Sequence, residues 1–211
     1  MSDTYFSIFS LPPHLVLDTA ALEKSFYALS RRLHPDRFAA RPAAEQEAAL
    51  AESSRLNDAY RTLRDPIGRT EYLLKLEGVE MEEQSRAATD AAKATGTAKK
   101  QVVPEDLLEE AFELNMQLEE MRAAKKMGGG GDPESADPQL RKDLLAAKST
   151  FDTKLATTDA DLTQLHAQWD SAFDANDVAG KTAARDAMVA LLNRRSYLRN
   201  LVRDVNDALE S

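Results

Sequence analysis

Large apolar side chains recur every three or four residues along most of the chain, which is the spacing of amphipathic helices. Alternation of apolar and polar positions, the pattern of half-buried strands, is nearly absent. The pattern therefore predicts an all-α protein. Two sets of this kind lie in the N-terminal part: Leu22, Phe26, Leu29 and Leu33, then Leu56, Tyr60 and Leu63.

Polar and turn-forming residues predict where the first helices begin and end. Asp18 stands where an N-cap is expected, since its carboxylate can accept bonds from the free N–H groups of a first turn. This helix should end at His34, because a residue that precedes proline is driven out of the helical region. An antiparallel partner is predicted over 42–64, and a further helix is expected between Asp65 and Gly78.

The helix that begins near Pro104 carries two sets of apolar residues. One set is spaced 4-3-4-3, as in a seam that packs on neighbouring helices: Leu107, Ala111, Leu114, Leu118 and Met121. The second set lies on the opposite flank, at about 100° per residue, next to several acids: Leu108, Phe112 and Met116. The second set is explained either by a broad buried face or by an exposed apolar patch of the kind that binds a partner.

Two further helices are predicted over about 138–173 and 178–210, so that three helices form a small antiparallel bundle. His166 and Trp169 lie one turn apart and are interpreted as packing residues. The stretch 82–103 holds almost nothing large to bury, and Met127–Pro138 is rich in glycine, so both are interpreted as linkers. The predicted organisation is an N-terminal domain over 1–78, a linker over 79–103 and a three-helix bundle over 104–211.

Charge and composition narrow the possible functions. The 211 residues carry a net charge of −9, most of it after residue 78, which argues against a general nucleic-acid binder. With no cysteine and three isolated histidines, neither a disulfide framework nor a metal centre is expected, and no motif indicates a cofactor. No apolar run approaches the ~20 residues of a membrane span, and no export signal is seen. We therefore expect a cytoplasmic protein, and a monomer because no continuous heptad array requires pairing.

The tripeptide His34-Pro35-Asp36 connects the two helices of the predicted hairpin. It can be simply a turn, since proline stops a helix and aspartate tolerates turn geometry. It can also be a catalytic dyad of an enzyme, but that would require a nucleophile or a metal, and no motif supplies either. Its place at the tip of an antiparallel hairpin is the arrangement of a J-domain.

Three segments together resemble the HscB family of J-proteins, the co-chaperones of iron–sulfur cluster biogenesis. They are YFSIFSLP near the N-terminus, HPDRF at 34–38 and LNDAYRTLRDPIGRTEYLL at 56–74. The resemblance implies that residues 1–78 dock on an ATP-driven chaperone of the HscA/DnaK class and stimulate its ATP hydrolysis, while the chain itself is not an enzyme. It implies that the chaperone is contacted by the turn and by the basic residues around it: Arg31, Arg32, His34, Pro35, Asp36 and Arg37.

The same resemblance implies that the second apolar set binds the iron–sulfur cluster scaffold protein. Two positions depart from the family pattern, because Glu109 replaces an apolar residue and Met116 replaces an acid. A general J-protein that serves unfolded clients is the alternative. The scaffold-binding positions that the resemblance implies are Leu108, Glu109, Phe112, Glu113, Met116, Glu120 and Tyr197.

Overall fold

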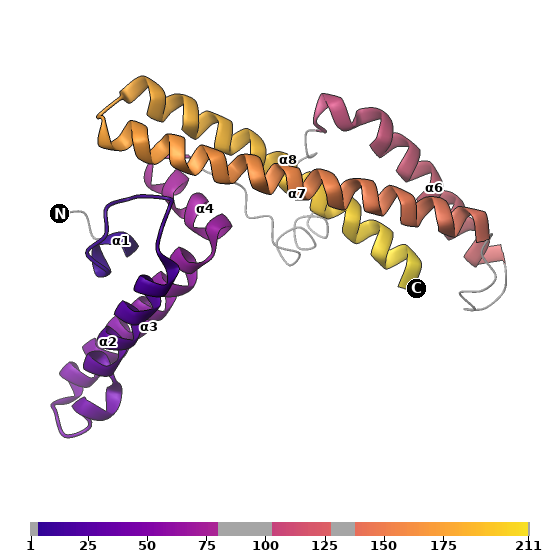
Figure 1. Cartoon of the computed structure of the whole chain (residues 1–211). Helices are drawn as coiled ribbons and strands as arrows, with labels where there is room; N and C mark the ends of the chain where they lie inside the picture. The colour runs from indigo at the N-terminus through magenta and orange to yellow at the C-terminus, as the bar shows by residue number, and fades with distance from the viewer. Residues whose placement is uncertain (1–3, 80–102, 128–137, 211) are drawn as a thin grey trace. The chain divides into compact units, whose positions relative to one another are not determined.

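A computed structural model of the chain describes residues 4–79, 103–127 and 138–210. These residues form helices and no strand, which confirms the all-α prediction (Figure 1). Apart from their end residues, the two predicted linkers lie outside the described residues. In chain order the elements are α1 (Tyr5–Ile8), α2 (Thr19–Leu33), the short 3₁₀ helix η1 (Pro35–Phe38), α3 (Ala43–Arg64), α4 (Pro66–Leu76), the 3₁₀ helix η2 (Glu105–Leu107), α6 (Leu108–Met127), α7 (Pro138–Asp174) and α8 (Val178–Glu210).

The chain divides into two compact units. The first contains residues 1–81 together with 165–186, and the second contains 82–164 together with 187–211. The first unit thus includes the end of α7 and the beginning of α8, although these lie far from residue 81 in the sequence. The domain division at residues 78 and 104 stays a prediction. None of the described helices combines the length and the apolar character that a membrane span needs.

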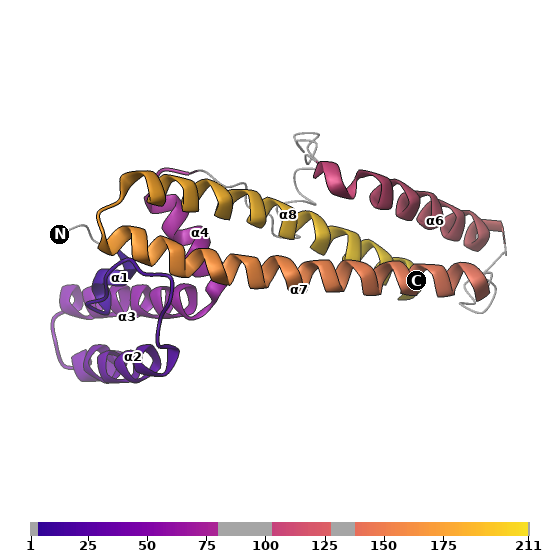
Figure 2. The ribbon, with the colours of Figure 1, turned by 45° about the horizontal axis from the view of Figure 1, so that its top comes forward.

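In the first unit α2 and α3 lie side by side and are connected through η1 (Figure 2). The residues that begin and end the helices are those that the sequence predicted. The Asp18 carboxylate accepts bonds from the N–H groups of Ala20 and Ala21, both at 3.0 Å, and begins α2. Asp65 caps α4 in the same way, and Gly78 follows α4 with φ +79°, a conformation that favours glycine.

The turn between α7 and α8 is held by close contacts within the first unit. Asn176 has φ +52°, and the Asp177 carboxylate accepts a bond of 3.0 Å from the Gly180 N–H, which caps α8. A Cβ atom at position 180 would collide with that carboxylate and lie 3.1 Å from the Ala172 methyl. Glycine is favoured here by this close approach and not by its φ, which is not positive.

The second unit is built around the seam of α6. All five seam residues are buried, and they pack with side chains from α7 and α8 such as Leu144, Phe151 and Leu198. Arg195, which interrupts the apolar spacing of α8, forms an ion pair of 2.6 Å with Asp159 of α7. The core of the second unit therefore shows the predicted packing of three helices, α6, α7 and α8.

Candidate functional site

The His-Pro-Asp turn is exposed and ordered by its own side chains. His34 ends α2 and also caps η1, because its Nδ1 accepts a bond of 3.3 Å from the Asp36 N–H. The Asp36 carboxylate lies 3.4 Å from the same Nδ1, and the side chains of His34 and Asp36 are 56% and 89% exposed. A neutral His34 in this arrangement carries its proton on Nε2, so that this N–H is available to a partner.

Basic side chains surround the turn. Arg31 and Arg32 lie in the last turn of α2, where a positive charge is favourable next to the helix carboxyl end, and both are exposed. Arg37 in η1 donates a bond of 3.4 Å to the Arg31 carbonyl oxygen, which brings the two segments together. The structure therefore gathers the predicted chaperone-contacting residues at one end of the α2–α3 hairpin.

The second apolar set of α6 is exposed. Leu108, Phe112 and Met116 are 51%, 68% and 58% exposed, while the seam on the opposite flank is buried. A broad buried face therefore does not explain these three residues. We call them the α6 stripe. Exposed large apolar side chains in a row, next to acids, have the composition of a protein-binding surface.

The remaining predicted scaffold-binding residues divide into two kinds. Glu109, Glu113 and Glu120 are exposed on α6 beside the stripe. Tyr197 on α8 is half-buried and packs against the core of the second unit. Burial, and secondarily the charge of Asp204, raise the pKa of the Tyr197 phenol. Tyr197 thus has a packing role that the sequence did not indicate.

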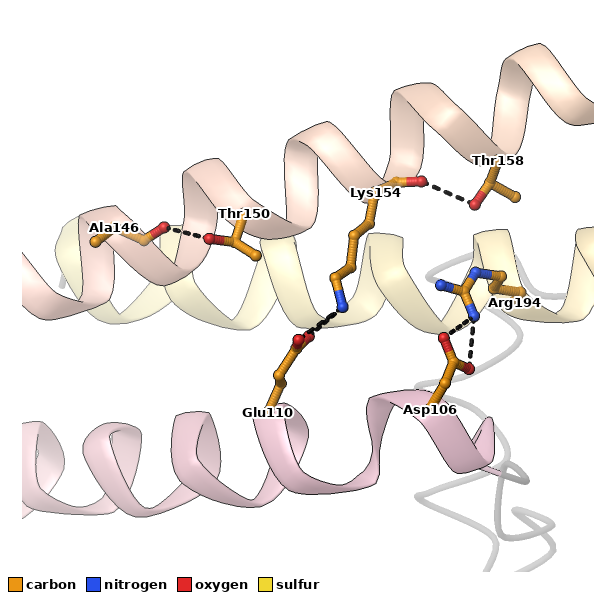
Figure 3. A network of polar contacts seen from close by, with 7 residues as sticks. All are labelled: Asp106, Glu110, Ala146, Thr150, Lys154, Thr158 and Arg194. Carbon is orange, nitrogen blue, oxygen red and sulfur yellow. Dashed lines mark hydrogen bonds and ion pairs between the residues drawn. The ribbon is translucent and has the colours of Figure 1, made fainter.

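Two ion pairs fasten the beginning of α6 to its neighbours in the second unit (Figure 3). Arg194 of α8 donates from one nitrogen to both carboxylate oxygens of Asp106, at 2.7 and 2.6 Å. Lys154 of α7 reaches both oxygens of Glu110, at 2.7 and 2.6 Å. The hydrogen bond from Arg194 lowers the pKa of the Asp106 carboxyl. These contacts fix which flank of α6 faces outward.

A set of polar contacts in the first unit was not predicted from the sequence. The Asp170 carboxylate of α7 accepts bonds from the backbone N–H groups of Leu15 and Val16, at 2.7 and 2.8 Å. One turn later Asp174 lies 2.9 Å from His14 Nε2. The spacing of four residues between Asp170 and Asp174 is visible in the sequence. Their partners lie about 155 positions away, near the N-terminus, and the sequence does not indicate them.

His166, one turn before Asp170, is buried as predicted for a packing residue, and it also has a hydrogen-bond partner. Its Nε2 lies 2.8 Å from the Thr70 hydroxyl, which donates its own proton to the Pro66 carbonyl oxygen. His166 therefore donates from Nε2 to the Thr70 hydroxyl oxygen. Burial, together with the nearby positive charge of Arg69, lowers the pKa of His166 to about 4.

Among the described residues, no group of three or more histidine, aspartate or glutamate side chains is arranged to hold a metal ion. Two exposed surfaces stand out in the structure: the basic turn in the first unit and the α6 stripe in the second. An antiparallel hairpin with an exposed His-Pro-Asp turn, in a chain with a second helical unit, is the arrangement that the sequence resemblance implies for the class of J-proteins of the HscB type.

Comparison with known proteins narrows this class. No family model matches the chain. The structure is similar to the chaperone HscB from Vibrio cholerae, with a TM-score of 0.57 and 25% sequence identity over 97% of this chain and 96% of that one. The human co-chaperone protein HscB has the same fold, with a TM-score of 0.53 and 23% identity over 97% of this chain and 81% of that one. The resemblance to HscB-type co-chaperones predicted from the sequence is confirmed.

Proposed function

We propose that this protein is a co-chaperone of iron–sulfur cluster biogenesis that links two partners. The basic turn docks on an ATP-driven chaperone of the HscA/DnaK class and stimulates its ATPase. The α6 stripe binds the cluster scaffold protein and delivers it to that chaperone for cluster transfer. The protein assists a reaction that its partner catalyses, and no catalytic residue is assigned to it.

The observation that carries this proposal is the exposure of the α6 stripe on a helix whose opposite flank is buried. A bundle helix needs only one buried flank, so a second flank with three large exposed apolar side chains calls for a binding partner. The acids beside the stripe, including Glu109 and Glu113, favour a partner with basic groups near its own apolar patch.

The chemistry of the His34–Asp36 turn supports docking rather than catalysis. The two side chains are exposed and order the turn between two helices, and the nearby arginines present positive charge. Exposed charges of one sign steer association with an acidic surface and fix its orientation, and they contribute to the rate of binding more than to the affinity. Holding the scaffold on the same chain raises its effective concentration at the chaperone.

The test is a titration of ATP hydrolysis by the cognate chaperone with this protein, in the presence and absence of the scaffold. We expect stimulation by the protein alone and greater stimulation when both are present. Stimulation that increases equally with a denatured client protein would favour the general J-protein function. Absence of stimulation in either case would contradict the proposal.

A further inference from the structure

Four polar residues of η2 and α6 lie on the edge of the helix that faces α7. Asp106, Glu110, Glu113 and Gln117 are spaced 4-3-4, so at about 100° per residue they form one row along the helix. The first two members of this row are neutralised by Arg194 and Lys154, as described above. At both positions an acid of η2 or α6 is therefore paired with a long basic side chain from a neighbouring helix.

Beyond Glu110 the row loses its basic partners. A groove of about 460 Å³ opens between α6 and α7, and its lining includes Glu113, Gln117, Asp143 and Thr150. Over the described part of the chain, the Glu113 side chain has no ion pair or hydrogen bond. The Oε1 atom of Gln117 is buried and accepts no hydrogen bond within the same residues.

The α7 side of the groove supplies no cation either. Thr150 lies one turn before Lys154 and occupies the place where the next basic side chain would be expected (Figure 3). Its hydroxyl donates a bond of 3.2 Å to the Ala146 carbonyl oxygen and reaches no group of α6. Asp143, one turn further along the groove from Ala147, adds a second carboxylate and accepts a bond from Gln139.

Within the described residues, two acceptors of the groove thus lack a donor, the Glu113 carboxylate and the Gln117 Oε1 atom, whereas Glu110 and Asp143 have partners. A buried carbonyl oxygen that accepts no hydrogen bond is unfavourable. Because a carboxylate lies next to it, a positively charged N–H donor would bind there more strongly than a neutral one. A lysine ammonium or an arginine guanidinium would satisfy Gln117 and neutralise Glu113 together. Lys154 shows that such a side chain fits between these two helices one turn away.

We propose that this groove receives a lysine or arginine side chain of the protein that docks on the α6 stripe. This inference rests on the proposed function, because it assigns a second contact to the same docked partner. Glu113 and Met116 of the stripe are three residues apart on α6 and are therefore neighbours on the helix surface, so a partner that covers the stripe reaches the edge of the groove. Binding there selects partners that carry a basic residue beside their apolar patch.

The main test fills the groove from within. Thr150→Lys places a cation one turn before Lys154, opposite Glu113, and Thr150→Gln is the control of similar length without charge. In isothermal titration of the full-length protein with the purified cluster scaffold, Thr150→Lys should weaken binding about five- to tenfold, as expected for loss of a charge-assisted contact. Its melting temperature should be unchanged or higher, and Thr150→Gln, which fills the same space without a charge, should weaken binding clearly less than Thr150→Lys.

A second variant removes the acceptor instead. Gln117→Leu should weaken scaffold binding several-fold while the melting temperature stays the same or rises. If Gln117 had only a structural role, the substitution would change the stability and leave the affinity unchanged. Glu210→Gln, at an exposed acid of α8, is the control for the loss of a charged or polar group elsewhere in the second unit.

The outcomes separate this inference from the proposed function. If the wild type binds the scaffold and Thr150→Lys and Gln117→Leu bind equally well, the groove is not a contact and the inference is overturned. If the wild type does not bind the scaffold, the proposed function itself fails. Heat released on titrating magnesium chloride alone, and lost in Gln117→Leu, would assign the groove to a metal ion and would also overturn the inference.

Discussion

His34 connects two helices through a single side chain. It is the C-cap of α2, directly after Leu33, and also the N-cap of η1, and its side chain is exposed. Because its Nδ1 is used within the turn, its Nε2 is the atom left for a partner. The proposed docking of the turn on a chaperone would therefore depend on this ring more than on the local fold.

His34→Gln should abolish most of the stimulation of the chaperone ATPase, with a loss of about tenfold or more. The melting temperature and helical content should not change, because exposed substitutions of this kind alter stability by only about 0.5 kcal/mol. The measurement is the ATPase titration together with circular dichroism. His14→Gln is the matched control in the same unit and should leave stimulation intact. If His34→Gln stimulates normally, the turn is only a connection.

His166 should make the stability of the protein depend on pH. In the unfolded chain it binds a proton with a pKa near 6.5, whereas in the folded protein burial and Arg69 lower its pKa to about 4. As the pH falls from 6.5 to 4 the unfolded state binds more protons, so this residue reduces stability across that range. Urea denaturation should show a loss on the order of 2 kcal/mol between pH 7 and pH 5.

His166→Gln is the control for this pH dependence, since glutamine can donate a hydrogen bond to Thr70 but does not titrate. The variant should lose less stability than the wild type over the same pH range. Equal losses in the two proteins would show that other groups cause the effect.

At the scale of the element, α6 presents two flanks with opposite expected responses to mutation. Converting Leu108 and Phe112 together to alanine should weaken scaffold binding at least about tenfold, because exposed apolar anchors of this kind dominate interfaces. The melting temperature should change little, since both side chains are exposed. Leu114→Ala, on the buried flank, should instead lower stability by about 2–5 kcal/mol. The measurements are isothermal titration and thermal unfolding.

Leu145→Ala is the matched control for this pair, since Leu145 is an exposed leucine of α7 in the same unit. It should alter neither binding nor stability appreciably. A large loss of stability in the Leu108/Phe112 variant would mark the stripe as part of a core, contrary to its exposure. Tyr197 is excluded from the variant because it packs on the core.

Local sequence signals predicted the helices of this chain well. Asp18, Asp65 and Gly78 mark helix ends through chemistry within one turn, and the apolar spacing of α6 identified its buried seam. The spacing left open whether the second apolar set is buried or exposed, and the structure shows that it is exposed. Contacts between distant segments were not predictable in the same way. Asp170 binds amides about 155 positions away, and nothing in its neighbours specifies that partner. The packing of Tyr197 was not predicted either, because spacing alone does not show which side of a helix contacts its neighbours.

At the scale of the whole molecule, the first compact unit contains two distant parts of the sequence. Residues 165–186 supply Asp170, which holds the backbone at Leu15 and Val16, and the buried ring of Trp169, whose indole N–H donates to the Pro13 carbonyl oxygen at 3.3 Å. The segment between α1 and α2 has several of its polar partners in the C-terminal half. The N-terminal part of this unit therefore depends on residues beyond its own stretch of sequence.

A fragment of residues 1–81 should be less stable than the same unit in the intact chain. It loses two hydrogen bonds to a carboxylate, each contributing about 1.5–3 kcal/mol, and the burial of Trp169. Its melting temperature should fall by more than about 10 °C, given about 4–8 °C per kcal/mol for a domain of this size. Differential scanning calorimetry of the fragment and the full chain provides the measurement.

Single substitutions in the full chain separate this effect from truncation itself. Asp170→Asn should reproduce part of the loss, whereas Asp161→Asn, an exposed position of α7 in the second unit, should not. A fragment that melts like the intact protein would contradict the dependence of the N-terminal part on residues 165–186.

The turn before α8 carries a consequence for sequence change in this protein. Any residue other than glycine at position 180 would push aside the carboxylate that caps α8 and press on the methyl group of Ala172. The strain would fall on the same short stretch that supplies Trp169 and Asp170 to the N-terminal helices. Replacing one hydrogen atom by a carbon at this position would thereby loosen the support of the segment that leads into α2.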